Sequence, residues 1–187
     1  MKNDKITLIA LCGKAGSGKD TILKEVVKAD PHIHEIIRCT TRPRREEEVE
    51  GKDYFYLTEE EFREKIDKKE ILEYSIFNNW MYGTPISSLD PNKINIVVLN
   101  TKEISLLKPR KDINLIICLV EASDKERLMR QLTREENPNV KEIIRRFQAD
   151  EEDYSNFEYR FNQSYVLKNH NKDDLITIVK ALSEHKK

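Results

Sequence analysis

The chain has 187 residues, of which 36% are charged, and its formal net charge at neutral pH is −1. This length is sufficient for one domain with a buried core, and the balanced charge gives no indication of a nucleic-acid or membrane partner. No apolar stretch has the length of a membrane span, and the N-terminal residues lack the apolar core of a secretory signal. We therefore expect a cytoplasmic protein.

The cysteines and histidines do not have the spacing of a metal site. Cys12, Cys39 and Cys118 are far apart in the sequence, and each lies in an apolar stretch. We expect them to be buried free thiols, because no disulfide framework or Cys/His ligand pattern is present.

The first predicted element is a buried strand at residues 6–12, which leads into a glycine-rich loop. Residues 13–19 are GKAGSGK, which has the Gly-x-x-x-x-Gly-Lys spacing of a phosphate-binding P-loop. Glycines let the backbone turn tightly around an anion, and the N–H groups of the loop and of the helix behind it attract phosphate. We therefore expect a nucleoside triphosphate to be bound by Gly13, Lys14, Ala15, Gly16, Ser17, Gly18, Lys19, Asp20 and Thr21.

Asp20 stands where a P-loop normally carries the Ser or Thr whose hydroxyl binds Mg²⁺. A carboxylate is also a good Mg²⁺ ligand, so Asp20 is the candidate metal ligand, although it adds negative charge beside the phosphates. The alternative, a glycine-rich turn without a ligand, is disfavoured because strand, glycines, lysine and helix coincide.

The remaining pattern alternates between strands and helices. We predict an amphipathic helix at 20–28, a strand at 33–39, then a polar segment, a strand at 54–57, a helix at 58–69 and strands at 71–77 and 80–82. Further strands are expected at 94–99, 113–120 and 165–167, with helices at 101–108, from 123 to about 134, at 140–154 and around 175–182.

This order predicts an α/β fold in which a parallel sheet has helices on both faces. Residues from about 39 to 86 interrupt the alternation and are expected to form a small α+β insertion. The ligands should bind outside the carboxyl ends of the strands.

Arginines are clustered in a way that favours phosphate recognition. One group is Arg42, Arg44 and Arg45. A second lies on the two helices predicted after the strand at 113–120, at Arg127, Arg130, Arg134, Arg145 and Arg146. Arginine suits bidentate phosphate binding, although each residue taken alone could equally form a surface salt bridge. The sequence shows no evident general base, and an acceptor that is already a phosphate dianion needs none. The pattern therefore favours transfer between two phosphates.

The chain resembles the guanylate kinase family of nucleoside monophosphate (NMP) kinases. The resemblance covers most of the length and rests on residues 13–19, 40–42 with Arg45 and Glu48, 51–54, 71–73 and 82–84, the arginine-bearing helices, and Asn169. It implies one P-loop kinase domain over residues 1–187, with a core of 1–38, 87–129 and 155–187, an insertion at 39–86 that binds the NMP, and a short helical lid at 130–154. It also implies transfer of the ATP γ-phosphoryl group to GMP or dGMP with Mg²⁺, and a catalytic set of Lys19, Arg42, Arg134, Arg145 and Arg146.

The resemblance further implies roles for individual residues. The NMP would be bound by Arg38, Thr40, Arg42, Arg45, Tyr54, Glu73, Tyr82, Gly83, Thr84 and Asn100. Within this set, Glu73 would read the guanine edge; from the sequence pattern alone it would be taken as an exposed strand residue. Arg130 would contact donor phosphates, and Asn169 would lie near the adenine.

The chain departs from the family pattern in four places. Asp20 replaces the P-loop hydroxyl, Arg38 occupies a position usually held by Ser, and Glu47 replaces a Gly. The fourth departure is at 99–102, where Leu-Asn-Thr-Lys replaces an expected Asp-x-Asp. We therefore weigh a deoxynucleoside monophosphate kinase of broader base choice, and a non-catalytic guanylate kinase-like interaction module, against a GMP kinase. The partners expected are ATP and an NMP, in a monomer or homodimer.

Overall fold

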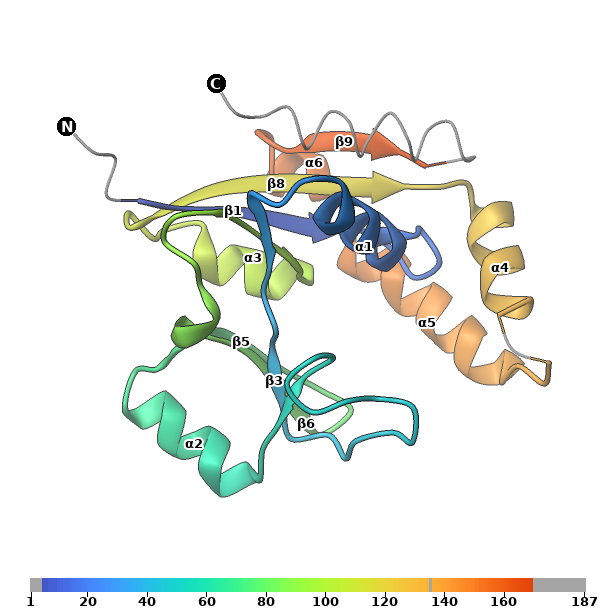
Figure 1. The fold of residues 1–187 in the computed structure, drawn as a ribbon. Coiled ribbons are helices and arrows are strands. Elements are labelled where there is room, and N and C mark those ends of the chain that lie inside the picture. Colours follow the sequence, from blue (N-terminus) through green and yellow to red (C-terminus); the bar gives the residue numbers. More distant parts are fainter. Residues whose placement is uncertain (1–4, 135, 170–187) are drawn as a thin grey trace.

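The core of the protein is a five-stranded parallel sheet (Figure 1). The structure is a computed structural model that describes residues 5–134 and 136–169. The strand order is β2-β7-β1-β8-β9. The bounds are β1 Ile6–Cys12, β2 Ile33–Glu35, β7 Ile94–Val98, β8 Ile113–Glu121 and β9 Tyr165–Lys168. The helix expected around residues 175–182 lies outside the described residues.

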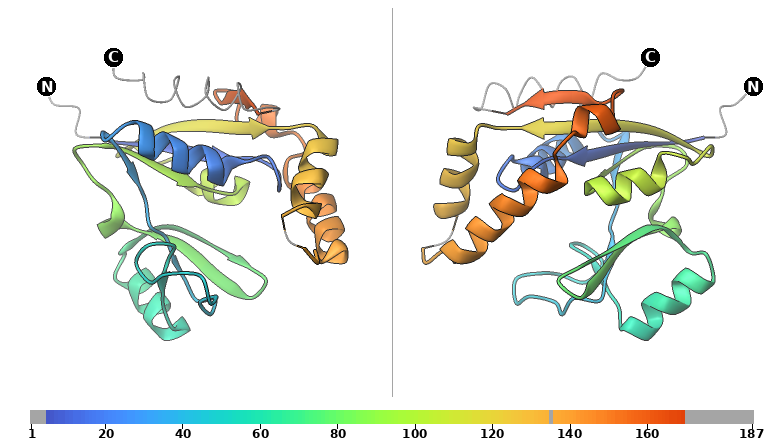
Figure 2. Two further views of the ribbon diagram at one scale, coloured as in Figure 1. Left: turned by 45° about the vertical axis from the view of Figure 1, so that its right-hand side comes forward. Right: turned by 180° about the vertical axis from the view of Figure 1, so that it is seen from behind.

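Alternation along β1 explains why helices cover both faces of this sheet. Leu8 and Ala10 pack on one face with α3 (Thr101–Leu107) and α6 (Phe157–Arg160), whereas Ile9 and Leu11 pack on the other with α1 (Lys19–Ala29). Successive side chains of a strand point to opposite faces, so an apolar stretch supplies two cores at once. Figure 2 shows the helices on the two sides, as the alternating pattern predicts.

A second, four-stranded sheet is formed by residues between 39 and 85, in the order β4-β3-β6-β5. Its strands are β3 Cys39–Thr40, β4 Phe55–Tyr56, β5 Ile71–Phe77 and β6 Trp80–Pro85. Helix α2 (Glu59–Asp67) begins at a capping box of Thr58 and Glu61 and buries Phe62 against Cys39 and Met81. The sheet lies below the core sheet in Figure 1.

The single strand predicted at 33–39 is in fact two strands that belong to different sheets. β2 pairs with β7 of the core sheet, whereas β3 pairs with β4 and β6 of the second sheet. The Ile36 N–H still donates to Ile96 of the core, and the Arg38 carbonyl already accepts from Phe55 of the second sheet. The intervening residues therefore carry the chain from one sheet to the other.

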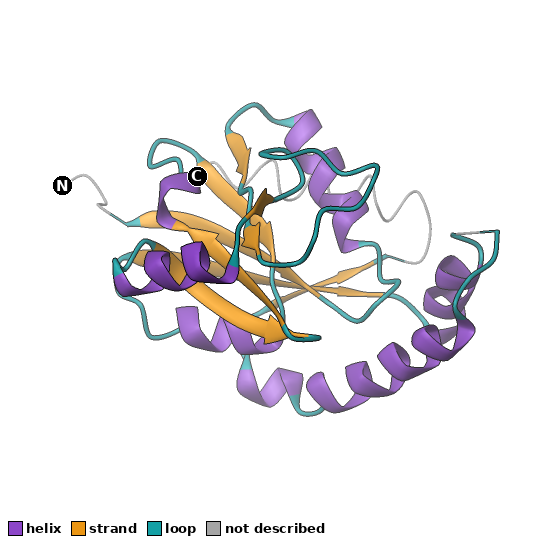
Figure 3. Ribbon diagram, turned by 90° about the horizontal axis from the view of Figure 1, so that it is seen from below, coloured by secondary structure: helices purple, strands orange, loops and turns teal. Residues whose placement is uncertain are grey.

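Two further helices, α4 (Asp124–Leu132) and α5 (Val140–Asp153), follow β8 in the chain. A short 3₁₀ helix at Ile86–Ser88 lies between the second sheet and β7 of the core. Figure 3, a view from below, shows helices outside the strands on both sides. Among the described residues, no helix is long and apolar enough to cross a membrane.

The three cysteines are buried and free, as predicted from the sequence. Burial raises the pKa of Cys12 and of Cys118 to about 12, and that of Cys39 to about 11. These thiols are therefore protonated and unreactive at neutral pH.

Candidate active site

The P-loop connects β1 to α1 with backbone angles that favour glycine. Gly16 has φ of 79° and Gly18 has φ of 94°, both in the left-handed region. A Cβ atom at Gly16 would lie 2.5 Å from the Arg127 carbonyl oxygen, and one at Gly18 would lie 2.4 Å from the Asn169 side-chain nitrogen. Both glycines are thus required by conformation and by close packing.

The amides of the loop divide into two groups. Within the described residues, the N–H groups of Gly16, Gly18 and Lys19 donate to no protein acceptor, and they lie at the N-terminus of α1. The N–H groups of Gly13 and Ala15 instead donate to Tyr154 Oη at 2.7 Å and Asp150 Oδ2 at 2.6 Å. The N–H group of Ser17 also donates to a protein acceptor, the Lys14 carbonyl at 3.1 Å. The expectation that the loop N–H groups attract phosphate therefore does not hold for these three in this structure.

Arg127, which lies on α4, holds the P-loop in place through the Ala15 carbonyl. Its side chain is 1% exposed; Nε donates to the Ala15 carbonyl at 3.1 Å, and its terminal nitrogens pair with Asp124 at 2.8 Å and Asp150 at 3.1 Å. The Lys14 ammonium pairs with Glu151 at 2.6 Å, so it points toward α5. Burial raises the pKa of Asp150, against the opposing effects of the Ala15 N–H, Arg127 and Lys19.

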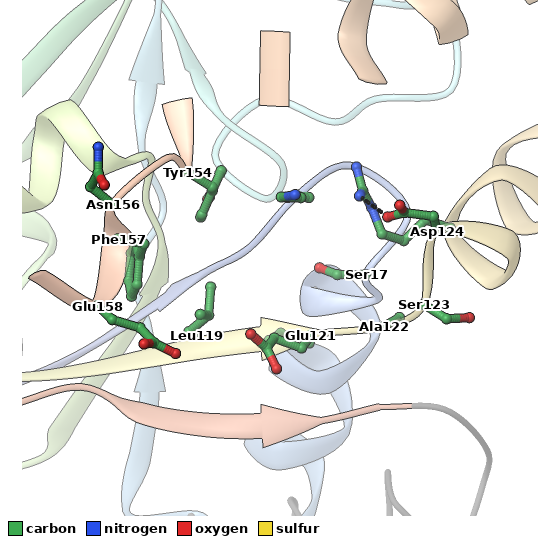
Figure 4. A pocket seen from close by; sticks show the side chains of 13 residues that line it. Ser17, Leu119, Glu121, Ala122, Ser123, Asp124, Tyr154, Asn156, Phe157 and Glu158 are labelled. Atoms are coloured by element: carbon green, nitrogen blue, oxygen red, sulfur yellow. Dashed lines mark hydrogen bonds and ion pairs between the residues drawn. The ribbon is translucent and has the colours of Figure 1, made fainter. Parts of the chain in front are cut away.

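A cavity of about 440 Å³ lies beside the P-loop and Arg127 (Figure 4). Tyr154, Phe157 and Leu119 line one side and Asp124 lies on the other, with Ser17 between them. None of the residues expected to bind the NMP lines this cavity.

Arg130 and Asn169 brace the C-terminal half of the loop. Arg130 donates to the carbonyls of Gly16 at 3.3 Å, Ser17 at 3.2 Å and Asn169 at 2.9 Å. The buried Asn169 side chain donates to the Ser17 carbonyl at 2.8 Å. Both residues, expected near the donor nucleotide, therefore contact the P-loop itself in this structure.

Lys19 is half-buried at the start of α1, and none of the carboxylates of the described residues pairs with it. Asp20 and Thr21 follow in the first turn, where both are exposed. The described residues contain no group of three or more metal-ligating side chains. A Mg²⁺ ion held there by protein would have Asp20 as its carboxylate, with phosphate oxygens and water as its other ligands.

A second cationic cluster forms on the smaller sheet around Arg42. One terminal nitrogen of Arg42 lies 2.7 and 2.9 Å from the two Glu48 oxygens, and the guanidinium lies 5.8 Å from the ring centres of both Tyr54 and Tyr56. Tyr82 meets Tyr54 edge-on at 6.1 Å. Although desolvation opposes the change, hydrogen bonds from Arg42, the Arg45 N–H and Tyr56 lower the pKa of Glu48 to about 2.

Three other residues expected to bind the NMP have different surroundings. Thr40 is fully buried; its hydroxyl donates to the Met81 carbonyl and accepts from the Arg42 N–H, so it shapes the backbone next to Arg42. Gly83 is required by packing, since a Cβ there would lie 2.9 Å from Phe62. Arg45 is exposed.

Glu73 lies in a buried polar pocket between β5, β6 and α3. Its side chain is 0% exposed, it accepts from Thr84, and Arg38 Nη2 lies 3.4 Å away. The same nitrogen lies 2.7 Å from Glu103, while Asn100 caps α3 and donates to Ser75 at the pocket edge. Burial is the main cause that raises the pKa of Glu73 to about 7, with Glu103 adding to it and Arg38 opposing it.

Three lid arginines, Arg134, Arg145 and Arg146, make no contact with the P-loop among the interactions of the described residues. Arg134 is exposed in the loop after α4. Arg145 and Arg146 both pair with Glu142 on α5, at 2.7 and 2.8 Å. Arg145 also lies 5.9 Å from the ring centre of Phe77, near the tip of the β5–β6 hairpin, so α5 contacts the second sheet.

Asp150, Tyr154 and Glu103 are site residues that the sequence did not indicate. Arg127 was expected to bind phosphate with its neighbouring arginines, but it is buried among carboxylates and donates to the Ala15 carbonyl.

Glu48 entered the prediction only as part of the family motif, and it pairs with Arg42 in the structure. Glu103 is the N3 residue of the capping box that starts at Asn100, which does not indicate its partner Arg38. The P-loop groups that contact Asp150 and Tyr154 are likewise remote in sequence, so no local spacing indicated them.

The parallel core sheet and the P-loop between β1 and α1 define the class of protein, a P-loop phosphotransferase, and a second cationic cluster lies on the smaller sheet. The family model of guanylate kinase matches residues 5–186. The chain therefore belongs to the guanylate kinase family, as the sequence motifs predicted, and it is a nucleoside monophosphate kinase.

Individual relatives agree with this assignment. A guanylate kinase of Prochlorococcus marinus is 32% identical over 181 residues, which cover 93% of this chain and 94% of that protein. A guanylate kinase of Thermotoga maritima is 44% identical over 77 residues, covering 41% of this chain and 37% of that protein. The crystal structure of guanylate kinase from Anaplasma phagocytophilum has a TM-score of 0.69 at 20% identity, covers 98% of this chain and 88% of that one, and supports the fold alone.

Proposed function

We propose that the protein transfers the γ-phosphoryl group of ATP to the phosphate of GMP or dGMP, giving GDP or dGDP and ADP. The observation that carries the choice of base is the buried Glu73 carboxylate, whose Oε2 has no hydrogen-bond partner in the described part of the chain. A buried oxygen without a donor is costly for the free protein and is explained by a ligand that supplies one.

Guanine provides the donors that this pocket lacks. Its N1–H and 2-amino groups are adjacent donors that one carboxylate accepts together, and the Thr84 hydroxyl lies beside Glu73 as a further polar group. Adenine presents an acceptor at N1 and has no 2-amino group, so it would leave the Glu73 oxygen unsatisfied. A site built to bond such donors rejects analogues that lack them.

The acceptor phosphate is assigned to the cluster around Arg42. Glu48 and the rings of Tyr54 and Tyr56 hold the Arg42 guanidinium in place, so little side-chain entropy remains to be lost on binding. Tyr54 and Tyr82 can add hydroxyl donors, and Arg45 lies at the exposed rim. The bound monophosphate is itself the nucleophile, because it is largely dianionic near neutral pH.

The donor phosphates are assigned to the P-loop. The amides of Gly16, Gly18 and Lys19 form the cradle, and the unpaired Lys19 ammonium neutralises charge on the transferred group. Catalysis then consists of alignment and charge neutralisation, without a protein base. We assign residues 130–154 to a lid whose Arg134, Arg145 and Arg146 approach the phosphates when it closes, with Asn169 near the adenine.

Mg²⁺ is part of this proposal, with Asp20 as its protein ligand. When bound, the ion would neutralise negative charge on the donor phosphates. Asp20→Ala should raise the Mg²⁺ concentration that gives half-maximal activity, and Glu25→Ala, an exposed carboxylate on the same helix, is the matched control. An unchanged Mg²⁺ requirement in Asp20→Ala would refute the ligand assignment.

The function is tested by a coupled ADP-release assay over all common NMPs and dNMPs. We expect turnover with GMP and dGMP only; turnover with dTMP, dCMP or dAMP would instead support the broader kinase suggested by Arg38 and Asn100. Lys19→Ala should lower kcat by about 10³-fold or more, since it removes a charge that acts on the transferred group. Lys28→Ala, at the exposed end of the same helix, should retain activity.

A further inference from the structure

Arg38 is shared unequally between two buried carboxylates. Its Nη2 lies 2.7 Å from Glu103 Oε1 but 3.4 Å from Glu73 Oε1. Charge-assisted hydrogen bonds are normally about 2.7–2.9 Å long, so Glu103 is the partner that holds the guanidinium. All three side chains are largely withdrawn from solvent, with exposures of 11% for Arg38, 0% for Glu73 and 1% for Glu103.

Glu103 is itself held rigidly from two elements. Its Oε2 accepts from the Asn100 N–H at 2.9 Å as part of the α3 capping box, and its Oε1 accepts from Ser75 of β5 at 2.6 Å. Both oxygens are therefore engaged, and the position of Arg38 follows from how α3 packs against β5.

Glu73 presents the opposite situation. Thr84 and the long contact to Arg38 both use Oε1, and Oε2 has no partner among the described residues. Arg38 Nε likewise is buried without an acceptor in that part of the chain. The pocket thus holds one unused acceptor and one unused donor near each other.

The arginine guanidinium and the donor edge of guanine are chemically alike. Both present two N–H donors in one plane, and a carboxylate can accept both from either group. If Arg38 turned fully onto Glu73, its donors would consume both oxygens, and the base would find no acceptor. The anchor on Glu103 prevents this competition.

We propose that Glu103 is a positioning residue for base selection, which anchors Arg38 so that Glu73 keeps a carboxylate oxygen for the guanine edge. The proposal rests on the proposed function of Glu73 as the reader of the base. It assigns Arg38 a second effect, because a cation fixed at this distance also favours the ionised form of the buried Glu73.

The test is a double-mutant cycle that compares Glu103→Gln, Arg38→Met and the double variant. In the wild-type background, Glu103→Gln should raise KM for GMP by about 10-fold or more, since Arg38 is released toward Glu73. In the Arg38→Met background, the same exchange should change KM for GMP by less than about 3-fold, because no guanidinium remains to compete. KM for ATP and kcat should stay within about 3-fold in Glu103→Gln.

The controls separate positioning from general loss of structure. Glu64→Gln makes the same exchange at an exposed ion pair on α2 and should leave every constant unchanged. Thermal melting reports folding; if Glu103→Gln does not fold, Glu103→Asp takes its place, because it keeps the charge but withdraws the carboxylate from Arg38.

Two results would overturn the inference. One is an unchanged KM for GMP in a folded Glu103 variant, and the other is an equal effect of Glu103→Gln with and without Arg38. Failure of the proposed function gives a different result, namely no GMP turnover by the wild-type protein.

Discussion

Arg127 beside the P-loop and Arg38 in the base pocket are both largely withdrawn from solvent, but they differ in whether the polar atoms around them have hydrogen-bond partners. Arg127 beside the P-loop pairs with Asp124, Asp150 and Glu151 and also donates to the Ala15 carbonyl. Arg38 in the base pocket has two carboxylates, yet its Nε and the Glu73 Oε2 remain buried without partners in the described chain.

The difference separates a structural network from a binding pocket. Around Arg127, the guanidinium donors reach acceptors from the loop and from α4 and α5, so the network stabilises one loop conformation before any nucleotide arrives. Around Arg38, the unsatisfied groups gain partners when a ligand or a water supplies them, or when the side chains rearrange. Loss of Arg127 should therefore reduce stability, whereas changes around Glu73 should alter substrate choice.

The largest effect is expected for Arg127→Leu. It leaves the partly buried Asp150 without its cation, and removing one partner of a buried ion pair costs about 3–5 kcal/mol. Because Asp124 and Glu151 remain solvated, we expect the lower end, about 3 kcal/mol in urea unfolding. Arg63→Leu, at an exposed ion pair on α2, is the control and should change stability by less than about 1 kcal/mol. Equal stabilities of the two variants would contradict the structural role of Arg127.

The next effect is expected for Glu73→Gln. The amide replaces one acceptor by a donor that opposes the guanine donors, so KM for GMP should rise about 10- to 100-fold, or about 1.4–2.7 kcal/mol. Urea unfolding should show little loss of stability, because the neutral side chain is easier to bury. An unchanged preference among acceptor nucleotides would show that Glu73 does not read the base.

A smaller change, of a few-fold in KM for GMP, is expected when the pH is varied. Glu73, which faces Arg38, Glu103 of α3 and Thr84 of β6, has a pKa raised to about 7, mainly by burial. KM for GMP should therefore fall as the pH rises from 6 to 8, since the ionised carboxylate is the better acceptor. Steady-state kinetics across this range would measure it, and Glu73→Gln should flatten the profile. A KM for GMP that rises with pH would contradict the assignment.

Ionisation of Glu73 has the opposite effect on the stability of the fold, which it lowers. The folded-state pKa of Glu73 lies above its ordinary value of 4.5, so between pH 4.5 and about 7 the native state holds the extra proton. The contribution of Glu73 to stability is thus greatest at low pH and declines as pH rises through this range. Urea unfolding at several pH values, compared with Glu73→Gln, isolates it.

The smallest effect is expected for Asp150→Asn. The asparagine carbonyl can still accept from the Ala15 N–H, and burial already disfavours the charge of Asp150. We expect a stability change within about 1 kcal/mol by urea unfolding, whereas Asp150→Ala, which removes the acceptor, should cost more. A larger loss in Asp150→Asn than in Asp150→Ala would show that charge, not the hydrogen bond, holds the loop.

Features that depend on neighbouring residues could be predicted from the amino-acid sequence. Glycine spacing specified the turns of the P-loop, apolar runs specified the core strands, and capping boxes specified where helices begin, because each depends on a few consecutive residues. The family motifs likewise indicated Arg42, Tyr54 and Glu73 without any coordinates.

Contacts between residues that are far apart in the sequence depend instead on how the helices and strands pack. Arg127 and Ala15 are 112 residues apart, Asp150 and Ala15 are 135 apart, and Arg38 and Glu103 are 65 apart. These pairs form because α4 and α5 dock beside the P-loop and α3 packs against β5. Because these groups are buried, each charge depends on the partners that packing places beside it. Packing supplies those partners around Arg127, whereas around Glu73 it leaves buried polar atoms without a partner among the described residues.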